Sequence, residues 1–273
     1  MLIRPNILFG DERGYMAEFN DLYQRAIYYD IVFKREVTQE IDFITQAYGQ
    51  INGRMPQSLI DLACGPGYHA RSAAKIGMRA IGLDLREEML LFAADQAALD
   101  GVHVEWIAAD MRHLQLKDPV DIAINVFDGI DCLNSNDDLV AHFHAIAANL
   151  TPGGIYIIDV TNPSQTSINS YHKFQYAGER DGVSVKINWA INDPKVDPVT
   201  HIAQTQLEML INEHGQQFRV VDYASERVLT AQEIVLLARL AGTLEPVAWY
   251  GDYDLNLPFT ESTPRMIAIL QKT

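Results

Sequence analysis

The sequence predicts an α/β fold in which a parallel sheet carries a smaller antiparallel sheet as an insertion. Between residues 58 and 160, apolar runs of strand length alternate with segments of helical periodicity, and each connection is long enough for a parallel β-α-β crossover. Between about 163 and 226 the apolar residues recur at every second position, which is typical of half-buried antiparallel strands. With 273 residues, 48% of them hydrophobic, the chain can bury a substantial core.

The first part of the chain, residues 16–48, is predicted to be helical. Its apolar side chains recur at helical spacing and form one stripe, made by Val37, Ile41, Ile44 and Tyr48. An apolar stripe of this kind packs against another part of the molecule. We therefore expect the N-terminal segment to cover part of the remaining fold.

The parallel part is predicted to alternate five strands with three helices. The strands are expected at 58–63, 79–84, 103–107, 120–126 and 155–160, and the helices at 67–76, 86–99 and 137–150. The turn formed by residues 151–154 precedes the fifth strand. Ligands of open α/β sheets bind beyond the carboxyl ends of such strands, so residues that follow a strand are the candidates for a site.

The second half of the chain is predicted to hold the antiparallel insertion and then to return to the parallel sheet. Antiparallel strands are expected at 183–191, 205–211 and 217–224, with a hairpin turn at 213–216. A helix at 230–241, ended by Gly242, and two strands at 244–250 and 265–271 follow. The chain's end is thus expected to complete the first sheet.

Charge and composition exclude several classes of protein. The net charge is −15 and no cluster of basic residues is present, which argues against binding to nucleic acid or to an anionic membrane. Neither Cys64 nor Cys132 belongs to a pair with metal-ligand spacing, and the eight histidines form no H-x-x-x-H pair, so we expect no metal site. No apolar run is long enough to span a bilayer, and the N-terminus lacks a signal-peptide pattern, so we expect a cytoplasmic protein.

A glycine-rich turn follows the first predicted strand. Gly65 and Gly67 flank Pro66, and because glycine has no Cβ, such a turn lets a ligand approach the backbone N–H groups. The spacing also satisfies the loose fingerprint of a dinucleotide site, so the glycines alone leave an NAD-dependent oxidoreductase open as an alternative.

Acidic residues at three successive strand ends narrow the choice of ligand. Asp61 ends the first strand, where its carboxylate can accept a hydrogen bond from an ammonium group held above the turn. Asp84 ends the second strand and has two oxygens for the two hydroxyls of a ribose. After the third strand, Asp110 stands beside the apolar Met111, a pair that suits the amino group and flat face of an adenine. A dinucleotide site requires neither an acid at Asp61 nor the pair formed by Asp110 and Met111.

These segments together resemble the class I S-adenosylmethionine-dependent methyltransferases, in their small-molecule branch. The resemblance covers most of the chain and rests on the stretches 61–67 (DLACGPG) with His69-Ala70, 82–85 (GLDL) with 88–90 (EML), 109–112 (ADMR), and 150–154 (LTPGG) before a strand. Two departures are visible. Ala63 stands at the first glycine of the family pattern, and Tyr68 stands where arginine is frequent.

The resemblance implies a fold and an activity. The implied fold is a Rossmann-like doubly wound sheet of seven strands in the order 3-2-1-4-5-7-6, with strand 7 antiparallel. The segment from Tyr29 to Phe33 resembles the start of a helical lid in this branch, which implies a lid over 1–55. The implied core comprises 56–162 and 226–273, and the antiparallel cap 163–225.

The implied activity is transfer of a methyl group from S-adenosylmethionine to a small-molecule acceptor by in-line displacement, with S-adenosylhomocysteine as the product. The acceptor atom remains open among nitrogen, oxygen and carbon. A non-catalytic subunit that keeps the cofactor pocket is a further alternative. No nucleic acid or membrane partner is implied, and the chain is expected to be a monomer or a homodimer.

The resemblance also assigns candidate residues. Those implied to bind the cofactor are Tyr29, Arg35, Asp61, Ala63, Gly65, Gly67, Asp84, Leu85, Met89, Asp110, Met111, Asn125 and Phe127. Arg35 is expected to reach the methionine carboxylate. Asp128 is the candidate general base and Tyr29 is expected to shape the lid, while Asp128 or its neighbour Asp131 is expected to contact the acceptor.

Overall fold

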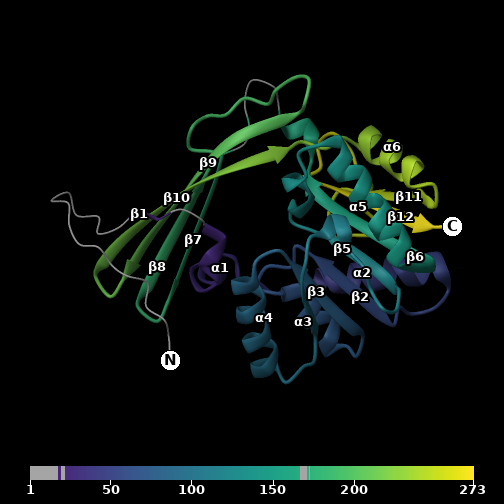
Figure 1. Ribbon diagram of the computed structural model, residues 1–273, viewed down its shortest axis with the longest axis horizontal. Coiled ribbons are helices and arrows are strands. Elements are labelled where there is room, and N and C mark those ends of the chain that lie inside the picture. The colour runs from purple at the N-terminus through teal and green to yellow at the C-terminus, as the bar shows by residue number, and fades with distance from the viewer. Residues whose placement is uncertain (1–17, 20–21, 167–170, 172) are drawn as a thin grey trace.

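The protein contains two sheets that lie side by side. The computed structural model describes residues 18–19, 22–166, 171 and 173–273. In Figure 1 the larger sheet has helices on both of its faces, and the smaller sheet extends away from it as a long, twisted layer. Helix α1 (Ala26–Phe33) lies between the two.

The larger sheet has seven strands in the order β11-β12-β6-β5-β2-β3-β4. The strands are β2 (Ser58–Leu62), β3 (Arg79–Asp84), β4 (Glu105–Ala108), β5 (Val120–Asn125), β6 (Leu150–Thr161), β11 (Leu244–Tyr250) and β12 (Arg265–Lys272). All neighbours are parallel except at β12, which runs antiparallel to both β6 and β11. Numbered within this sheet alone, the order is 3-2-1-4-5-7-6 with strand 7 antiparallel, so the predicted topology is confirmed.

Two helical layers bury the faces of this sheet. One apolar cluster packs α5 (Asn136–Asn149) and α6 (Ala231–Ala241) on one face, and another packs α2 (Thr38–Asn52), α3 (Tyr68–Lys75) and α4 (Glu87–Asp100) on the other. Every residue of β2 and β5 is buried, as a strand covered on both faces requires. The ends of α6 follow from its sequence: Thr230 and Glu233 form a capping box, and Gly242 ends the helix in the left-handed conformation.

The smaller sheet has the strand order β1-β10-β9-β8-β7. Its strands are β1 (Glu18–Phe19), β7 (Phe174–Arg180), β8 (Val183–Trp189), β9 (Ile202–Glu213) and β10 (Gln216–Arg227). The predicted antiparallel cap and its hairpin are confirmed, and His214 and Gly215 form the turn with positive φ. The prediction missed β7, because its inward positions include Gly178 and Arg180 rather than a run of apolar residues.

Two local predictions were wrong. The segment 16–48 is not one helical region: the residues before 18 lie outside the described residues, and a short 3-10 turn (Leu22–Gln24) and α1 precede a break at 34–37. The break occurs because the apolar residues on its two sides join different clusters, Phe33 with the smaller sheet and Val37 with the larger. The expected turn at 151–154 is also absent, since β6 begins at Leu150 with an irregularity in its pairing to β5.

The described part of the chain contains no helix that is both long and apolar enough to cross a membrane. Cys64 is buried and Cys132 is exposed, and both are free thiols. Among the described residues, no three histidine, cysteine, aspartate or glutamate side chains are placed to hold one metal ion.

A buried histidine between α5 and β6 predicts how stability depends on pH. His142 is fully buried, and its ring nitrogens contact the Tyr156 hydroxyl at 2.7 Å and the Met111 carbonyl at 3.1 Å. Burial lowers the pKa of His142 to about 4, below the ordinary value near 6.5. The neutral ring is therefore favoured in the folded state. Its contribution is fully present above pH 6.5 and is lost as the pH falls toward 4.

We expect the wild-type protein to lose about 3 kcal/mol more unfolding free energy between pH 7 and pH 4 than a His142→Gln variant, which has no proton to bind at this position. Urea unfolding followed by circular dichroism at several pH values measures the difference. The matched control is His144→Gln, since His144 lies on the same helix but is exposed. Equal pH slopes for the wild type and His142→Gln would contradict the assignment.

Candidate functional site

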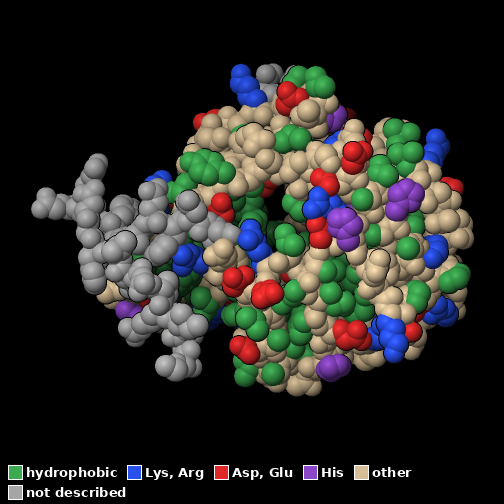
Figure 2. All heavy atoms as spheres, in the orientation of Figure 1, with side chains coloured by type: hydrophobic (Ala, Val, Ile, Leu, Met, Phe, Trp, Pro, Cys, Tyr) green, Lys and Arg blue, Asp and Glu red, His purple; other side chains and the backbone are tan. Residues whose placement is uncertain are grey.

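The candidate residues gather at the carboxyl edge of the larger sheet, where it meets α1 and the smaller sheet. Figure 2 shows a hollow between the two parts of the molecule in this region, with acidic and basic side chains at its rim. The turn after β2, the end of β3 and the segment after β5 all reach this edge. The topology thus brings together residues that are separated in the sequence.

The glycine turn is held by Asp84. The backbone N–H of Gly65 donates to Oδ2 of Asp84 at 2.8 Å, and the N–H of Arg86 donates to Oδ1 at 2.9 Å. Burial raises the pKa of Asp84, although these backbone donors act to lower it. Each carboxylate oxygen retains a second lone pair and can still accept a hydroxyl group. Ala63 adopts the left-handed conformation with φ 55°, which accounts for the glycine common at this position in the family pattern.

The two glycines of the turn serve different purposes. Both have positive φ, 51° for Gly65 and 72° for Gly67. A Cβ on Gly65 would meet no atom within 4 Å, whereas a Cβ on Gly67 would lie 2.4 Å from the Trp106 ring. Gly65 therefore faces open space that a ligand can enter. The lack of a side chain at Gly67 makes room for Trp106, and its expected approach to the cofactor stays a prediction.

Asp61 presents a carboxylate oxygen suited to a cationic group. The residue is 1% exposed, and its Oδ2 has no hydrogen-bond partner among the described residues. Burial raises the pKa of Asp61 to about 6 despite the lowering effect of the nearby His69. A buried acceptor without a donor is unfavourable, and an ammonium group would satisfy it. This observation fits the predicted contact with an amino group.

Arg35 does not project freely into the site. Its guanidinium donates two hydrogen bonds to Glu40, both at 3.2 Å, and lies 4.8 Å from the centre of the Phe127 ring. His69 also bonds to Glu40. Burial acts to raise the pKa of Glu40, but the hydrogen bonds and charges of His69 and Arg35 lower it overall. Arg35 is therefore committed to Glu40, and its predicted contact with a ligand carboxylate stays a prediction.

Asp110 is likewise paired within the protein. It accepts the backbone N–H of Arg112 at 2.9 Å and three hydrogen bonds from the Arg112 guanidinium, and these guanidinium hydrogen bonds lower the pKa of Asp110. Met111 is buried beside it, and its sulfur accepts from the Asn125 amide at 3.6 Å. Oδ1 of Asn125 is buried without a hydrogen-bond partner among the described residues. The expected adenine contacts of these residues remain predictions.

The segment after β5 adopts an unusual backbone that orients two candidate residues. Phe127 and Asp128 both have positive φ, 56° and 63°. Asp128 accepts the backbone N–H of Thr161, the Thr161 hydroxyl at 3.2 Å and a guanidinium N–H of Arg265 at 3.0 Å. Both carboxylate oxygens of Asp128 are thus held by donors of β6 and β12. These contacts indicate a structural role and do not support the predicted general base.

The remaining candidates differ in exposure. Leu85 is 68% exposed and Met89 is 2% exposed. Tyr29 packs between Tyr23 and Phe33, with ring centroids at 5.9 and 4.4 Å. Burial raises the pKa of Tyr29, and the charge of Asp84 contributes in the same direction. Tyr29 therefore packs among aromatic rings, and its predicted contact with the cofactor and its part in the lid stay predictions.

Asp30 anchors α1 beside the site, a role that the sequence did not reveal. It is 1% exposed and accepts the Tyr68 hydroxyl at 2.7 Å and a guanidinium N–H of Arg180 at 2.6 Å. These bonds tie α1 to α3 of the larger sheet and to β7 of the smaller sheet. The departure at Tyr68 is thereby explained, because its hydroxyl anchors α1. The available signal was that Asp30 follows Tyr29 in the motif used for the lid.

A second group missed by the sequence lies on the side of the smaller sheet. Glu226 accepts the indole N–H of Trp189 at 2.8 Å, and its other oxygen, Oε2, is buried without a hydrogen-bond partner among the described residues. Oδ1 of Asp131 is also buried without a hydrogen-bond partner among the described residues. Asp131 also lines a cavity of about 20 Å³ together with Tyr171 and Phe174. The sequence suggested Asp131 as an acceptor contact but assigned nothing to Glu226.

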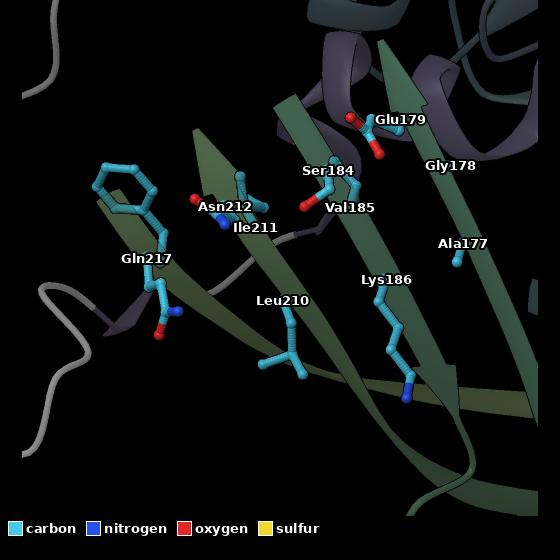
Figure 3. A pocket seen from close by; sticks show the side chains of 11 residues that line it. Ala177, Gly178, Glu179, Ser184, Val185, Lys186, Leu210, Ile211, Asn212 and Gln217 are labelled. Carbon is cyan, nitrogen blue, oxygen red and sulfur yellow. The ribbon is translucent and has the colours of Figure 1, made fainter. Parts of the chain in front are cut away.

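A separate groove of about 530 Å³ crosses the smaller sheet and contains none of these residues. Its lining comes from β7, β8, β9 and β10, and Figure 3 shows Lys186, Leu210 and Gln217 among the side chains along it. It lacks both the glycine turn and the strand-end acids. The candidate site therefore lies at the carboxyl edge of the larger sheet and not in this groove.

Comparisons with known proteins agree with this location. Residues 59–154 match the family model described as a methyltransferase domain. The cypemycin N-terminal methyltransferase of a Streptomyces species is 24% identical over 219 residues, which cover 79% of this chain and 83% of that protein. A ubiquinone biosynthesis O-methyltransferase of Colwellia psychrerythraea is 26% identical over 182 residues, covering 66% of this chain and 68% of that protein.

The fold has solved counterparts as well. The structure of an S-adenosylmethionine-dependent methyltransferase from Clostridium acetobutylicum superimposes with a TM-score of 0.74 and 20% sequence identity, covering 92% of this chain and 96% of that one. The matched segment 59–154 contains the glycine turn, Asp84 and Asp110. An NAD-dependent oxidoreductase is accordingly not supported. Residues 59–154 are therefore similar to a methyltransferase domain, and the whole chain has the fold of a solved S-adenosylmethionine-dependent methyltransferase.

Proposed function

We propose that the protein transfers the methyl group of S-adenosylmethionine to a small-molecule acceptor held between the larger sheet and the cap. The observation that carries the proposal is the juxtaposition at one edge of three features: the open space over Gly65, the Asp84 carboxylate and the unpartnered oxygen of Asp61. At this edge Phe33 of α1 contacts Phe127, the residue that follows β5, with ring centroids 5.8 Å apart. The acceptor would then bind next to the donor.

The residues present fit the cofactor. Asp84 would hold the ribose hydroxyls, Asp61 the ammonium group of the methionine part, and the backbone at Gly65 would pass close to the ligand. S-adenosylmethionine supplies a methyl group on a cationic sulfur that is a good leaving group. The protein then has to align the acceptor, exclude water and set the acceptor's protonation state. Tyr29, packed against Phe33, provides part of the cover that excludes water.

The comparisons do not select the acceptor atom, because the names of the relatives include both an N-terminal methyltransferase and an O-methyltransferase. Isothermal titration calorimetry with S-adenosylhomocysteine tests the donor half of the proposal. We expect saturable binding of one ligand per chain. Absence of measurable binding at millimolar ligand would refute the proposal. Release of S-adenosylhomocysteine during incubation with a metabolite panel tests the acceptor half.

A further inference from the structure

Glu40 joins two basic side chains beside the glycine turn. It lies in the first turn of α2, and its two carboxylate oxygens accept from Nε and Nη2 of Arg35, both at 3.2 Å. Its Oε2 also bonds to Nε2 of His69, in the first turn of α3. An ionised carboxylate only accepts hydrogen bonds, so Nε2 of His69 is the donor. We call these three side chains the Glu40 network.

The network lies at the carboxyl ends of two neighbouring strands, β2 and β5. Arg35 stands over the ring of Phe127, the second residue after β5, with its Cζ 4.8 Å from the ring centroid. His69 is followed in α3 by Ala70, whose backbone N–H donates to the Asp61 carboxylate on β2. The strands β2 and β5 are parallel partners in the sheet. The network therefore extends from the end of one strand to the end of the next.

Glu40 occupies only one edge of the Arg35 guanidinium. A guanidinium has five N–H donors in a planar fork, and one carboxylate binds two of them side by side. The bonds to Glu40 use Nε and Nη2, so the outer edge formed by Nη1 and Nη2 still has N–H groups to donate. The Arg35 side chain is 33% exposed. A second carboxylate can therefore bind to the outer edge without displacing Glu40.

The two ends of this arrangement carry opposite charges. At one end Oδ2 of Asp61 is buried without a hydrogen-bond partner among the described residues, and it suits an ammonium group. Burial raises the pKa of Asp61 to about 6, so this carboxylate is ionised at pH 7.5. At the other end the outer edge of Arg35 suits a carboxylate. A ligand with an ammonium group and a carboxylate on one carbon atom, such as the methionine part of S-adenosylmethionine, matches both.

Arg35 needs an anchor because it lies in the segment 34–37, between α1 and α2. A long arginine side chain without partners samples many rotamers, and a ligand that orders it loses affinity to conformational entropy. Glu40 and the face of Phe127 hold the guanidinium in one orientation before the ligand binds. Glu40 itself is held by His69 and by the N-terminal end of α2, where the helix dipole favours a carboxylate.

From these contacts, and resting on the proposed function, we propose that Glu40 is a positioning residue of the donor site. It holds the Arg35 guanidinium so that the outer edge receives the carboxylate of the cofactor, while Asp61 receives the ammonium group. Glu40 contacts neither group of the ligand and acts through Arg35. The preference of the site for ligands that carry the amino-acid end therefore depends on Glu40.

The test compares two ligands that differ only at this end. S-adenosylhomocysteine carries the amino acid, whereas 5′-methylthioadenosine has the same adenine, ribose and thioether sulfur but ends in a methyl group. Calorimetry at pH 7.5 measures the binding of each ligand to the whole chain. We expect the wild type to bind S-adenosylhomocysteine at least about tenfold more tightly. In Glu40→Gln the affinity for S-adenosylhomocysteine should fall about tenfold, and the affinity for 5′-methylthioadenosine should change less than about twofold.

A double-mutant cycle tests whether Glu40 acts through Arg35. Arg35→Met should weaken the binding of S-adenosylhomocysteine at least about tenfold and leave the binding of 5′-methylthioadenosine unchanged. Addition of Glu40→Gln to Arg35→Met should then change neither affinity by more than about twofold, because the residue that Glu40 positions is already gone. Glu36→Gln is the matched control, since it removes an exposed carboxylate from the same segment and should affect neither ligand.

Several outcomes would overturn the inference. Glu40→Gln could weaken both ligands equally, as a residue that only stabilises the fold would do, or it could leave unchanged or tighten the binding of S-adenosylhomocysteine. An equal loss from Glu40→Gln with and without Arg35 would also contradict it. An unchanged preference in Arg35→Met overturns it even where Glu40→Gln does not fold. A wild type that binds both ligands equally refutes this inference alone, whereas a wild type that binds neither refutes the proposed function.

Discussion

Replacement of Asp84 by alanine is expected to weaken the binding of S-adenosylhomocysteine at least ~100-fold. Two hydrogen bonds between ribose hydroxyls and a carboxylate contribute about 1.5–3 kcal/mol each, and every 1.4 kcal/mol is a factor of ten in affinity. The substitution also removes the acceptor of the Gly65 N–H, which holds the turn in place. Calorimetric titration of the wild type and the variant measures the effect.

Asp84→Asn separates the two contributions. Its amide keeps one oxygen as an acceptor but loses the charge, so we expect an affinity between those of the wild type and Asp84→Ala. Asp118→Ala is the control, since Asp118 is exposed and accepts from Arg79 only through its carbonyl oxygen. The assignment of Asp84 to the ribose is wrong if circular dichroism shows that Asp84→Ala is folded and its affinity for S-adenosylhomocysteine lies within threefold of the wild-type value.

The sequence predicted the part of the site whose residues lie close together along the chain. The strand, the acid Asp61, the turn at Gly65 and the start of α3 lie within fourteen residues, and the structure confirms that arrangement of elements. The alternation of strands and helices likewise predicted the parallel sheet. Residues that follow parallel strands lie at one edge of the sheet, because the carboxyl ends of the strands meet there. The local pattern of strands and helices therefore also predicts where the site lies.

Contacts between residues far apart in the sequence could not be predicted from it. Asp30 and Arg180 are 150 residues apart, and only the packing of α1 on β7 brings them together. That packing requires Gly178, whose Cβ would lie 2.1 Å from the Ile31 carbonyl oxygen. Glu226 lies one residue before the end of β10, an ordinary alternating strand, and only tertiary packing buries its Oε2 without a hydrogen-bond partner among the described residues. For the same reason the sequence alone does not reveal the ion pair of Asp128 with Arg265, and the role of Asp128 as general base stays a prediction.

Asp30→Ala is expected to release α1 from both sheets. The change leaves the Tyr68 hydroxyl and the Arg180 guanidinium without their shared acceptor. Removing one partner of a buried ion pair costs 3–5 kcal/mol, and Arg180 is one-third exposed, so we expect the unfolding free energy to fall by about 2–3 kcal/mol. Because α1 carries Tyr29 and Phe33, the affinity for S-adenosylhomocysteine should fall about tenfold, since each 1.4 kcal/mol is tenfold. Urea unfolding and calorimetry measure the two effects.

Two further variants test whether Asp30 anchors α1 or only stabilises the fold as a whole. Asp42→Ala removes an exposed aspartate of α2 and should leave both quantities unchanged. Tyr68→Phe removes one of the two donors and should cost about 1 kcal/mol, the net value of a typical hydrogen bond. Hydrogen exchange at residues 26–33 should accelerate in Asp30→Ala more than exchange in β2 and β5, because only α1 loses its attachments. If exchange accelerates equally in α1 and in the central strands, Asp30 stabilises the whole fold rather than anchoring the helix over the site.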